Sequence, residues 1–300
     1  MVSATTMGKP RIDVLVDVKP RLGEGPLWDV REERLYFVDS LGDRLFRCRA
    51  DGRELQTFEV PGHVGAMALR EEGGALLALA DGFHRYDLDS HESVLLVDPE
   101  PELLGNRLND GKVDRQGRFV CGSMDTAEEA PSGRLWSLEA DLEPRLLDTD
   151  IICSNGPCFS PDGTTLYFAD SFRGVIYAYD YDVATGEVSG RREFVRPETR
   201  PGGAPDGATV DAEGCLWTAL VFDGRIVRYA PDGSLDREIE MPVVKTTSVA
   251  FGGLGLDTLF VTSMAHPPLP KYPGDGPLRG ALFAISGLGV RGLPERRFAG

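Results

Sequence analysis

The sequence has no long hydrophobic run and no cysteine pair motif. No apolar segment approaches the roughly 18 residues that a transmembrane helix needs, so none is expected. The N-terminal residues MVSATTMGKPRIDVLVDV lack the apolar core and the cleavage-like site of a secretory signal. The 5 cysteines are odd in number and irregularly spaced, and no CxxC motif occurs. Together these absences predict reduced thiols and a cytoplasmic location.

Several catalytic signatures are also missing. The chain has no GxSxG nucleophile elbow, no HExxH zinc motif, no Walker A loop and no GxGxxG sequence after a strand. Its 4 histidines form no spaced pair, which argues against a histidine-based zinc site and a Ser-His-Asp triad. The segment DYDVATGE at 180–187 begins like a calcium-binding EF-hand loop, but Ala184 and Thr185 replace a ligand and the required glycine. It is predicted to be a hairpin loop.

Basic residues are in deficit. The chain has 32 lysines and arginines against 48 aspartates and glutamates, which gives a formal charge of −16. This surplus of negative charge argues against a nucleic-acid partner and against an anionic membrane surface. The acidic residues are dispersed along the chain, so they are expected to form a solvated surface. The expected partner is a small molecule, and nothing in the sequence identifies a protein partner.

The sequence does contain an internal repeat. Six times a short apolar strand pattern follows the same position, in the segments EGPLWD, GAMALR, NDGKVD, NGPCFS, DGATVD and TSVAFG. The equivalent positions, called slots below, are Glu24, Gly65, Asn109, Asn155, Asp206 and Thr247. Successive slots are 41, 44, 46, 51 and 41 residues apart. A period of about 40 to 50 residues indicates a repeat architecture with one supersecondary unit in each repeat.

Each repeat is predicted to contain four short strands separated by turns. The strand after the slot leads through a turn such as PDG into a second strand such as TLYFADS, and two further strands follow. Helical periodicity with caps is nearly absent, while 36 glycines and 21 prolines suit a turn-rich chain. We therefore predict an all-β fold, a six-bladed β-propeller of four-stranded antiparallel blades around a central channel. Residues 1–300 are expected to form one domain.

The two ends of the chain are expected to meet in one blade. An unpaired edge strand is a liability, and a propeller protects its edges by closing the ring. The candidate for closure is RIDVLVDV, residues 11–18, which would complete the sixth blade together with the C-terminal strands. Residues 1–10 are expected to form a flexible N-terminal segment.

Equivalent slots of a propeller lie side by side around the channel. Glu24, Asn109, Asn155 and Asp206 would then converge without being near each other in the sequence. Two carboxylates and two amides at one mouth suit a hard divalent cation. The small residues in the other two slots, Gly65 and Thr247, would leave that side of the mouth open to a substrate.

Each of these signals has a simpler explanation when it is taken alone. Glu24 could be an exposed turn residue, and Asn155, like Asn109, could belong to a tight turn. Asp206 lies in a PDG sequence, and two other PDG sequences are interpreted as ordinary turns. Asp206 differs because its repeat has a separate AEG turn after the following strand, which places the aspartate at the channel end of that strand. The common register of four oxygen-bearing residues favours a site.

These residues together resemble the gluconolactonase/regucalcin (senescence marker protein) family. The resemblance rests on LGEGPLW, NRLNDGKVDRQGRFVCGSM, SNGPCFSPDGTTLYFADS, PDGATVDAEGCLWTA, KTTSVAFGG and ISGLGVRGLPERRFAG, and it extends from about residue 20 to the C-terminus. It implies a six-bladed β-propeller that hydrolyses sugar lactones with one divalent cation in its channel. The short loop before SGRLW resembles that of microbial members and implies a more open pocket than in animal members.

The resemblance also implies roles for individual residues. Glu24, Asn155 and Asp206 match the protein ligands of the cation, and Asp206 also matches the residue proposed as general base. Arg107 and Asn109, in NRLND, match the substrate-binding pair. A further substrate contact falls in GSMDTAEEAPSGRLW, where a gap leaves three acidic residues as alternatives: Asp125, Glu128 and Glu129.

The expected function is therefore metal-dependent hydrolysis of an aldonolactone of a pentose or hexose to the aldonic acid. A bound divalent cation would polarise the ring ester and stabilise the oxyanion that forms. Oxygen ligands alone leave Ca²⁺, Zn²⁺, Mg²⁺, Mn²⁺ and Fe²⁺ as candidates. The alternatives are a calcium-binding regulatory protein, a related metal-dependent esterase or phosphotriesterase, and a propeller used for protein interaction. An interaction propeller would not need four oxygen-bearing residues in its channel.

Overall fold

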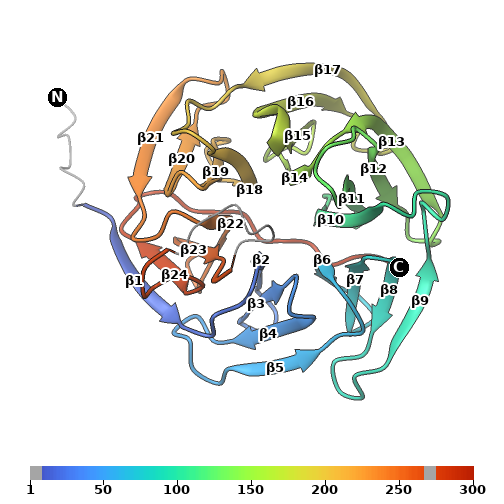
Figure 1. The fold of residues 1–300 in the computed structure, drawn as a ribbon, viewed down its shortest axis with the longest axis horizontal. Coiled ribbons are helices and arrows are strands. Elements are labelled where there is room, and N and C mark those ends of the chain that lie inside the picture. Colours follow the sequence, from blue (N-terminus) through green and yellow to red (C-terminus); the bar gives the residue numbers. More distant parts are fainter. Residues whose placement is uncertain (1–8, 267–274) are drawn as a thin grey trace.

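The computed structural model describes residues 9–266 and 275–300. Most of the segment expected to be flexible, residues 1–10, lies outside these described residues. The described residues form 24 β-strands and one short 3-10 helix. No helix among them is long and apolar enough to cross a membrane. The strands form six sheets of four strands each, arranged around a central axis (Figure 1).

The first three sheets, called blades 1 to 3, follow one another along the chain and around the ring (Figure 1). Blade 1 contains β2 (Gly23–Asp29), β3 (Arg34–Asp39), β4 (Arg44–Cys48) and β5 (Gln56–Glu59). Blade 2 contains β6 (Val64–Leu69), β7 (Ala75–Leu79), β8 (Gly82–Tyr86) and β9 (Ser93–Val97). Blade 3 contains β10 (Asn106–Val113), β11 (Phe119–Asp125), β12 (Gly133–Leu138) and β13 (Pro144–Ile151).

Blades 4 to 6 complete the ring (Figure 1). Blade 4 contains β14 (Ser154–Phe159), β15 (Thr165–Asp170), the 3-10 helix η1 (Ser171–Arg173), β16 (Val175–Tyr181) and β17 (Val188–Val195). Blade 5 contains β18 (Ala204–Val210), β19 (Leu216–Val221), β20 (Arg225–Tyr229) and β21 (Leu235–Glu240). Blade 6 contains β22 (Thr246–Gly252), β23 (Thr258–Ser263), β24 (Leu282–Ser286) and β1 (Arg11–Val16). The predicted six-bladed propeller is confirmed.

The ring closes as the sequence predicted. The N-terminal strand β1 pairs with the C-terminal strand β24 and forms the outer edge of blade 6. The pairing is antiparallel, with Ile12 opposite Ile285 and Val14 opposite Phe283. Because the outermost strand of this blade comes from the other end of the chain, blade 6 cannot form until both termini have met.

The burial of each strand follows its position in the blade. The innermost strands β6 and β14 are buried along their whole length, whereas the outermost β21 has mainly exposed residues. Inner strands are covered by neighbouring blades, so apolar or small residues occupy both of their faces. Outer strands have one face in solvent, and polar residues such as Asp236, Glu238 and Glu240 are tolerated there.

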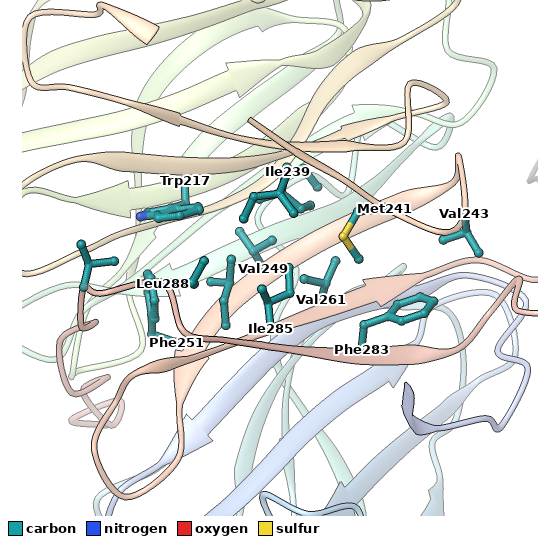
Figure 2. Packing of buried hydrophobic residues seen from close by; sticks show 14 of the residues in the cluster. Trp217, Ile239, Met241, Val243, Val249, Phe251, Val261, Phe283, Ile285 and Leu288 are labelled. Carbon is teal, nitrogen blue, oxygen red and sulfur yellow. The ribbon is translucent and has the colours of Figure 1, made fainter. Parts of the chain in front are cut away.

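The hydrophobic core lies between neighbouring blades. Figure 2 shows Trp217 and Ile239 of blade 5 packed against Val249, Phe251 and Val261 of blade 6. Trp217 is fully buried, and its ring meets that of Phe251 edge-on, with centroids 5.8 Å apart. Burying a large apolar side chain stabilises a fold by about 1.5–3 kcal/mol. The interfaces between blades therefore hold the ring together and leave the channel available for polar residues.

Each innermost strand is irregular at its slot. In β2 the pairing with β3 jumps from Glu24 to Leu27, and similar shifts occur at or across the slots of β6, β10, β14, β18 and β22. Bulges of this kind bend a strand and redirect the side chain at the bend. The slots were predicted to lie just before the strands. The slots lie within the strands instead, because the hydrogen-bonded pairing with the second strand continues on the mouth side of each bulge.

The C-terminal residues 288–300 cover the channel end opposite the slots. They form hydrogen bonds with turns that follow the innermost strands, for example from the Gly292 N–H to the Leu256 carbonyl oxygen and from the Ala299 N–H to that of Gly117. The Arg297 guanidinium also pairs with Asp29 at 2.8 Å. A void of only about 20 Å³ remains beside this tail. The tail thus leaves the slot end of the channel as the accessible mouth.

Candidate active site

A cavity of about 340 Å³ lies at the slot end of the channel. Four slot residues line it: Glu24 from β2, Asn109 from β10, Asn155 from β14 and Asp206 from β18. Arg107, two residues before the slot in β10, also contributes to the lining. The structure therefore brings together the five residues to which the sequence assigned cation and substrate binding.

Glu24 and Asp206 place two carboxylates in a desolvated cavity. Asp206 is only 6% exposed, and Glu24 is half-buried. Burial raises the pKa of Glu24 well above its usual value, and the nearby carboxylates of Asp206 and Asp110 raise it further. Burial also raises the pKa of Asp206, with a second contribution from Asp110. Holding these like charges together costs free energy unless a cation or protons accompany them.

Asn155 is held by hydrogen bonds at both ends of its amide. Its Nδ2 donates to Ser171 Oγ at 2.8 Å, and its Oδ1 accepts from Asn109 Nδ2 at 3.0 Å. Ser171 Oγ in turn donates to the Pro205 carbonyl oxygen at 2.7 Å, which ties blade 4 to blade 5. A carbonyl oxygen has two lone pairs, so Asn155 Oδ1 retains one acceptor position for a ligand in the cavity.

Arg107 and Asn109 form a connected pair on β10. Arg107 Nη1 donates to Asn109 Oδ1 at 2.6 Å and to the Leu108 carbonyl oxygen at 3.1 Å. Asn109 Nδ2 donates to the Ser154 carbonyl oxygen at 2.7 Å as well as to Asn155. A guanidinium carries five N–H groups, and these two bonds engage a single nitrogen. Arg107 can therefore be fixed by its neighbours and still donate to a bound molecule.

The two remaining slots do not line the cavity. Thr247 is fully buried, and its Oγ1 donates to the Gly23 carbonyl oxygen at 2.5 Å, which joins blade 6 to blade 1. A Cβ atom at Gly65 would lie 2.5 Å from the Asn109 carbonyl oxygen, so only glycine fits between blades 2 and 3. These slots were expected to open one side of the mouth. They allow close packing of blades instead, because neighbouring innermost strands approach each other at these positions.

The acidic segment after β11 contributes Glu128 to the cavity. Glu128 is the one of the three acidic alternatives that lies among the described lining residues. Asp125 is occupied in its own turn, where its Oδ2 accepts from the Ala130 N–H at 2.8 Å and the Glu129 N–H at 3.0 Å, and these hydrogen bonds lower its pKa. The Glu129 side chain is exposed. Glu128 has a left-handed backbone, with φ 62°, a strained conformation that is often retained at functional sites.

The sequence reasoning missed the residues that follow the second strand of a blade. Ser171 and Phe172 follow β15, Phe222 follows β19 and Met264 follows β23, and all four line the cavity. None of them belongs to a motif with fixed spacing. Their common position in the repeat could have identified them, because the second strand of each blade ends at the same channel mouth as the slots.

A separate acidic cluster on blade 5 is not part of this site. Asp211, Glu213 and Cys215 bring metal-ligating atom types within 4.8 Å of one another. Arg228, however, donates to Asp211 Oδ2 at 2.8 Å and to Glu213 Oε2 at 2.6 Å. Asp211 Oδ2 also accepts from Trp217 Nε1 at 2.8 Å. Because the arginine already offsets the negative charge, we assign this cluster a structural role.

The cavity residues suit a hard divalent cation. Glu24, Asn155 and Asp206 supply two carboxylates and an amide oxygen, which are donor types that hard divalent cations prefer. Glu24 Oε2 accepts only a long hydrogen bond, 3.3 Å, from the Gly25 N–H within the described part of the chain. The Glu24 carboxylate is thus poorly supplied with protein donors, as expected for oxygens that coordinate a cation.

The chain matches known proteins over most of its length. The family described as SMP-30/Gluconolactonase/LRE-like region matches residues 22–265. The chain is 37% identical over 281 residues to a 6-deoxy-6-sulfogluconolactonase of Pseudomonas putida, covering 93% of this chain and 95% of the relative. It is 38% identical over 291 residues to an L-arabinolactonase of Azospirillum brasilense, covering 96% and 95% of the two chains.

A solved structure extends the comparison to the fold. The calcium-binding protein regucalcin of Agrobacterium tumefaciens superimposes with a TM-score of 0.87 and 30% sequence identity. The superposition covers 95% of this chain and 96% of that protein. The similarity therefore includes all six blades and both ends of the ring.

Proposed function

This chain belongs to the SMP-30/gluconolactonase/LRE-like family, and we propose that it hydrolyses the lactone of a pentose or hexose to the aldonic acid with the help of one divalent cation. The observation that carries the proposal is the meeting of Glu24, Asn155 and Asp206 with Arg107 in one cavity. The relatives named as sugar lactonases support the reaction class.

Arg107 would bind the substrate. The oxygen-bearing residues of the cavity would bind the cation. The guanidinium of Arg107 is charged at all relevant pH values and can donate directed hydrogen bonds to lactone oxygens. Glu24, Asn155 and Asp206 would hold the cation, and the two carboxylates would offset its charge. When bound, the cation would withdraw electron density from the lactone carbonyl and favour the ionisation of a nearby water molecule.

Asp206 would accept the proton of the attacking water. Its carboxylate lines the cavity beside the other proposed cation ligands, so it would be within reach of a water molecule that the cation makes more acidic. The water oxygen adds to the carbonyl carbon, and the ring C–O bond then breaks as the carbonyl group re-forms. The former ring oxygen takes up the proton that Asp206 received and leaves as a hydroxyl group, so one water and one lactone give one hydroxy acid.

The candidate cations are Ca²⁺, Zn²⁺, Mg²⁺, Mn²⁺ and Fe²⁺. The all-oxygen donor set of Glu24, Asn155 and Asp206 suits a hard divalent cation and does not choose among the five.

A calcium-binding regulatory protein is the second candidate function. It is favoured by the similarity to the calcium-binding protein regucalcin of Agrobacterium tumefaciens. A related esterase or phosphotriesterase would use the same residues on another ester. Turnover of a lactone separates the first proposal from these alternatives, because a regulatory protein needs cation binding alone.

The test is a panel of aldono-1,4- and aldono-1,5-lactones assayed by acid release. Chelator-treated protein is mixed with each of the five cations in turn. We expect acid release well above the spontaneous rate with at least one cation, and its loss when the chelator is added again. Release of acid at the spontaneous rate with every lactone and every cation would contradict the proposal.

We also propose that the protein acts in the cytoplasm and without a nucleic-acid or membrane partner. All five cysteines are unpaired and buried, which is in keeping with a reducing compartment. The formal charge of −16 disfavours polyanionic partners.

A further inference from the structure

The cavity has an outer level as well as the inner level of the slots. In blade 4, β14 pairs with β15 so that Asn155 lies opposite Ala169. Phe172 follows three residues later in η1 and therefore lies nearer the mouth. A side chain at this level can contact a bound molecule without reaching the inner oxygens.

Apolar residues occupy the outer level on three further blades. Phe222 follows β19, in which Leu220 pairs with Pro205, the residue before the slot of blade 5. Met264 follows β23 and Leu22 precedes β2, and both line the cavity. We call the set the apolar arc, and it consists of Leu22, Phe172, Phe222 and Met264.

Blade 3 supplies the charged residues on the other side of the outer level, beside the apolar Met124. Arg107 and Glu128 both come from blade 3, which lies across the ring from blade 6 (Figure 1). Among the cavity-lining residues that the structure describes, Arg107 is the one cation. A lactone whose ring is held by Arg107 would therefore direct its exocyclic end toward the apolar arc.

Phe222 is the most constrained member of the arc. Its backbone is left-handed, with φ 61°, a conformation that is uncommon for an aromatic residue. The ring packs against a small cluster formed by Leu22, Val221 and Met264. Phe172, by contrast, is 41% exposed on its short helix. The mouth thus combines a strained backbone at Phe222 with a partly exposed ring at Phe172.

We propose that the apolar arc selects lactones whose exocyclic end is uncharged and terminates in a hydrocarbon group. It favours 6-deoxyhexonolactones over hexonolactones that carry a hydroxyl at C6, and it rejects lactones with a phosphate or sulfonate at C6. This inference rests on the proposed lactonase function and names the substrate class of the same cavity.

The selection follows from the loss of water at the exocyclic end. A methyl group in contact with Phe172 and Phe222 gains from burial, whereas a hydroxyl gives up water and finds no donor or acceptor in the side chains of the arc. A hydrophobic pocket discriminates at one such group by about 10- to 100-fold in kcat/KM. A phosphate or sulfonate would additionally need a second cation, and the net charge of −16 opposes its approach.

The test compares D-fucono-1,4-lactone with D-galactono-1,4-lactone, since these probes differ only in the C6 hydroxyl. The cation-loaded protein is assayed for kcat/KM on both, and on a hexonolactone carrying a C6 phosphate. We expect the 6-deoxy lactone to be preferred by about tenfold or more, and the phosphorylated lactone to be the poorest substrate.

Two variants assign the preference to the arc. Phe222→Asn introduces an amide at a φ that asparagine tolerates, and it should lower the ratio of the two kcat/KM values about tenfold. Leu142→Asn is the matched control, because Leu142 has φ 68° in a turn away from the cavity, and its ratio should be unchanged. Phe172→Gln is a second arc variant at an exposed position, so it keeps the test valid if Phe222→Asn fails to fold.

The outcomes separate this inference from the function on which it rests. Turnover of both lactones with a ratio near one, or an unchanged ratio in both arc variants, overturns the apolar arc and leaves the lactonase intact. Preference for the phosphorylated lactone also overturns it. Failure to hydrolyse any lactone overturns the proposed function itself.

Discussion

Asn109 Nδ2 lies 3.0 Å from Asn155 Oδ1, and this hydrogen bond joins the slots of two neighbouring blades. Through its Oδ1, Asn109 also accepts from Arg107 Nη1 at 2.6 Å. Asn109 thus connects Asn155, a proposed ligand of the cation, to Arg107, the proposed substrate-binding residue. Both ends of its amide form hydrogen bonds within the protein, and its Oδ1 keeps one acceptor position, as that of Asn155 does. Direct contact between Asn109 and substrate stays a prediction.

The Glu24→Gln variant should bind the divalent cation at least about tenfold more weakly than the wild type. The change removes one of two negative charges from the donor set and keeps the side-chain volume, and charge count tunes affinity at oxygen sites. Metal titration by calorimetry measures the effect. Glu59→Gln on the exposed face of β5 is the control. Equal metal content in purified Glu24→Gln and wild-type protein would refute the assignment.

The metal-free protein should lose stability as the pH rises from about 4 toward neutrality. The folded-state pKa values of Glu24 and Asp206 are raised above the ordinary 4.5 and 3.8, so the folded state binds more protons than the unfolded state in this range. Stability therefore falls with rising pH until the raised folded-state pKa values are passed. Added cation should reverse the fall, because it binds the ionised carboxylates.

Thermal unfolding with and without cation, measured from pH 4 to pH 8, checks this pH dependence. The gain in Tm on adding the cation should grow with pH. The double variant Glu24→Gln/Asp206→Asn should strongly reduce both effects, since it removes two of the three neighbouring carboxylates with a raised pKa and leaves Asp110. A Tm difference between the metal-free and loaded wild type that does not change with pH would show that these carboxylates do not control stability.

The Arg107→Ala variant should lower kcat/KM for lactones by about tenfold, as expected for the loss of one charge-assisted hydrogen bond. Cation affinity should change little, because Arg107 does not supply a cation ligand. Steady-state kinetics and metal titration give the two readouts. Arg196→Ala, at an exposed ion pair on the surface, is the matched control. Kinetics identical to the wild type would place Arg107 outside the substrate site.

The Asp206→Asn variant should lower kcat about 10²- to 10⁴-fold at saturating cation, the typical effect of losing a general base. Cation occupancy must be confirmed by elemental analysis, so that weaker binding is not taken for lost proton transfer. A kcat near that of the wild type at full occupancy would rule out the base role. Asp125 is then a poor substitute, because its carboxylate caps its own turn.

The Asp211→Ala variant should destabilise the protein by about 3–5 kcal/mol, because it removes a fully buried partner of Arg228 and leaves buried N–H groups unpaired. Urea unfolding measures the loss. Cation content and lactone kinetics per folded molecule should not change, since this cluster is structural. A fall in bound metal without a fall in stability would show that Asp211 belongs to a metal site.

Much of the fold could be predicted because its signals are local and repeated. A strand pattern recurring about every 40 to 50 residues defines six blades, and the predicted strand at residues 11–18 contains β1, which closes the ring with β24. The same register predicted that Glu24, Asn109, Asn155 and Asp206 converge, since equivalent positions of a ring share one end of the channel. These conclusions need only the spacing of residue types along the chain.

The tertiary structure alone decided which neighbours each slot meets. Gly65 and Thr247 occupy slots, yet they pack between blades. The sequence of a single strand does not predict how closely it approaches the strand of the next blade. Glu128 rather than Asp125 reaches the cavity because backbone N–H groups capture the Asp125 carboxylate. Phe222 lines the mouth through the end of a second strand and a left-handed backbone. Which side chains reach the cavity depends on how distant segments pack together. No local sequence pattern predicts that packing.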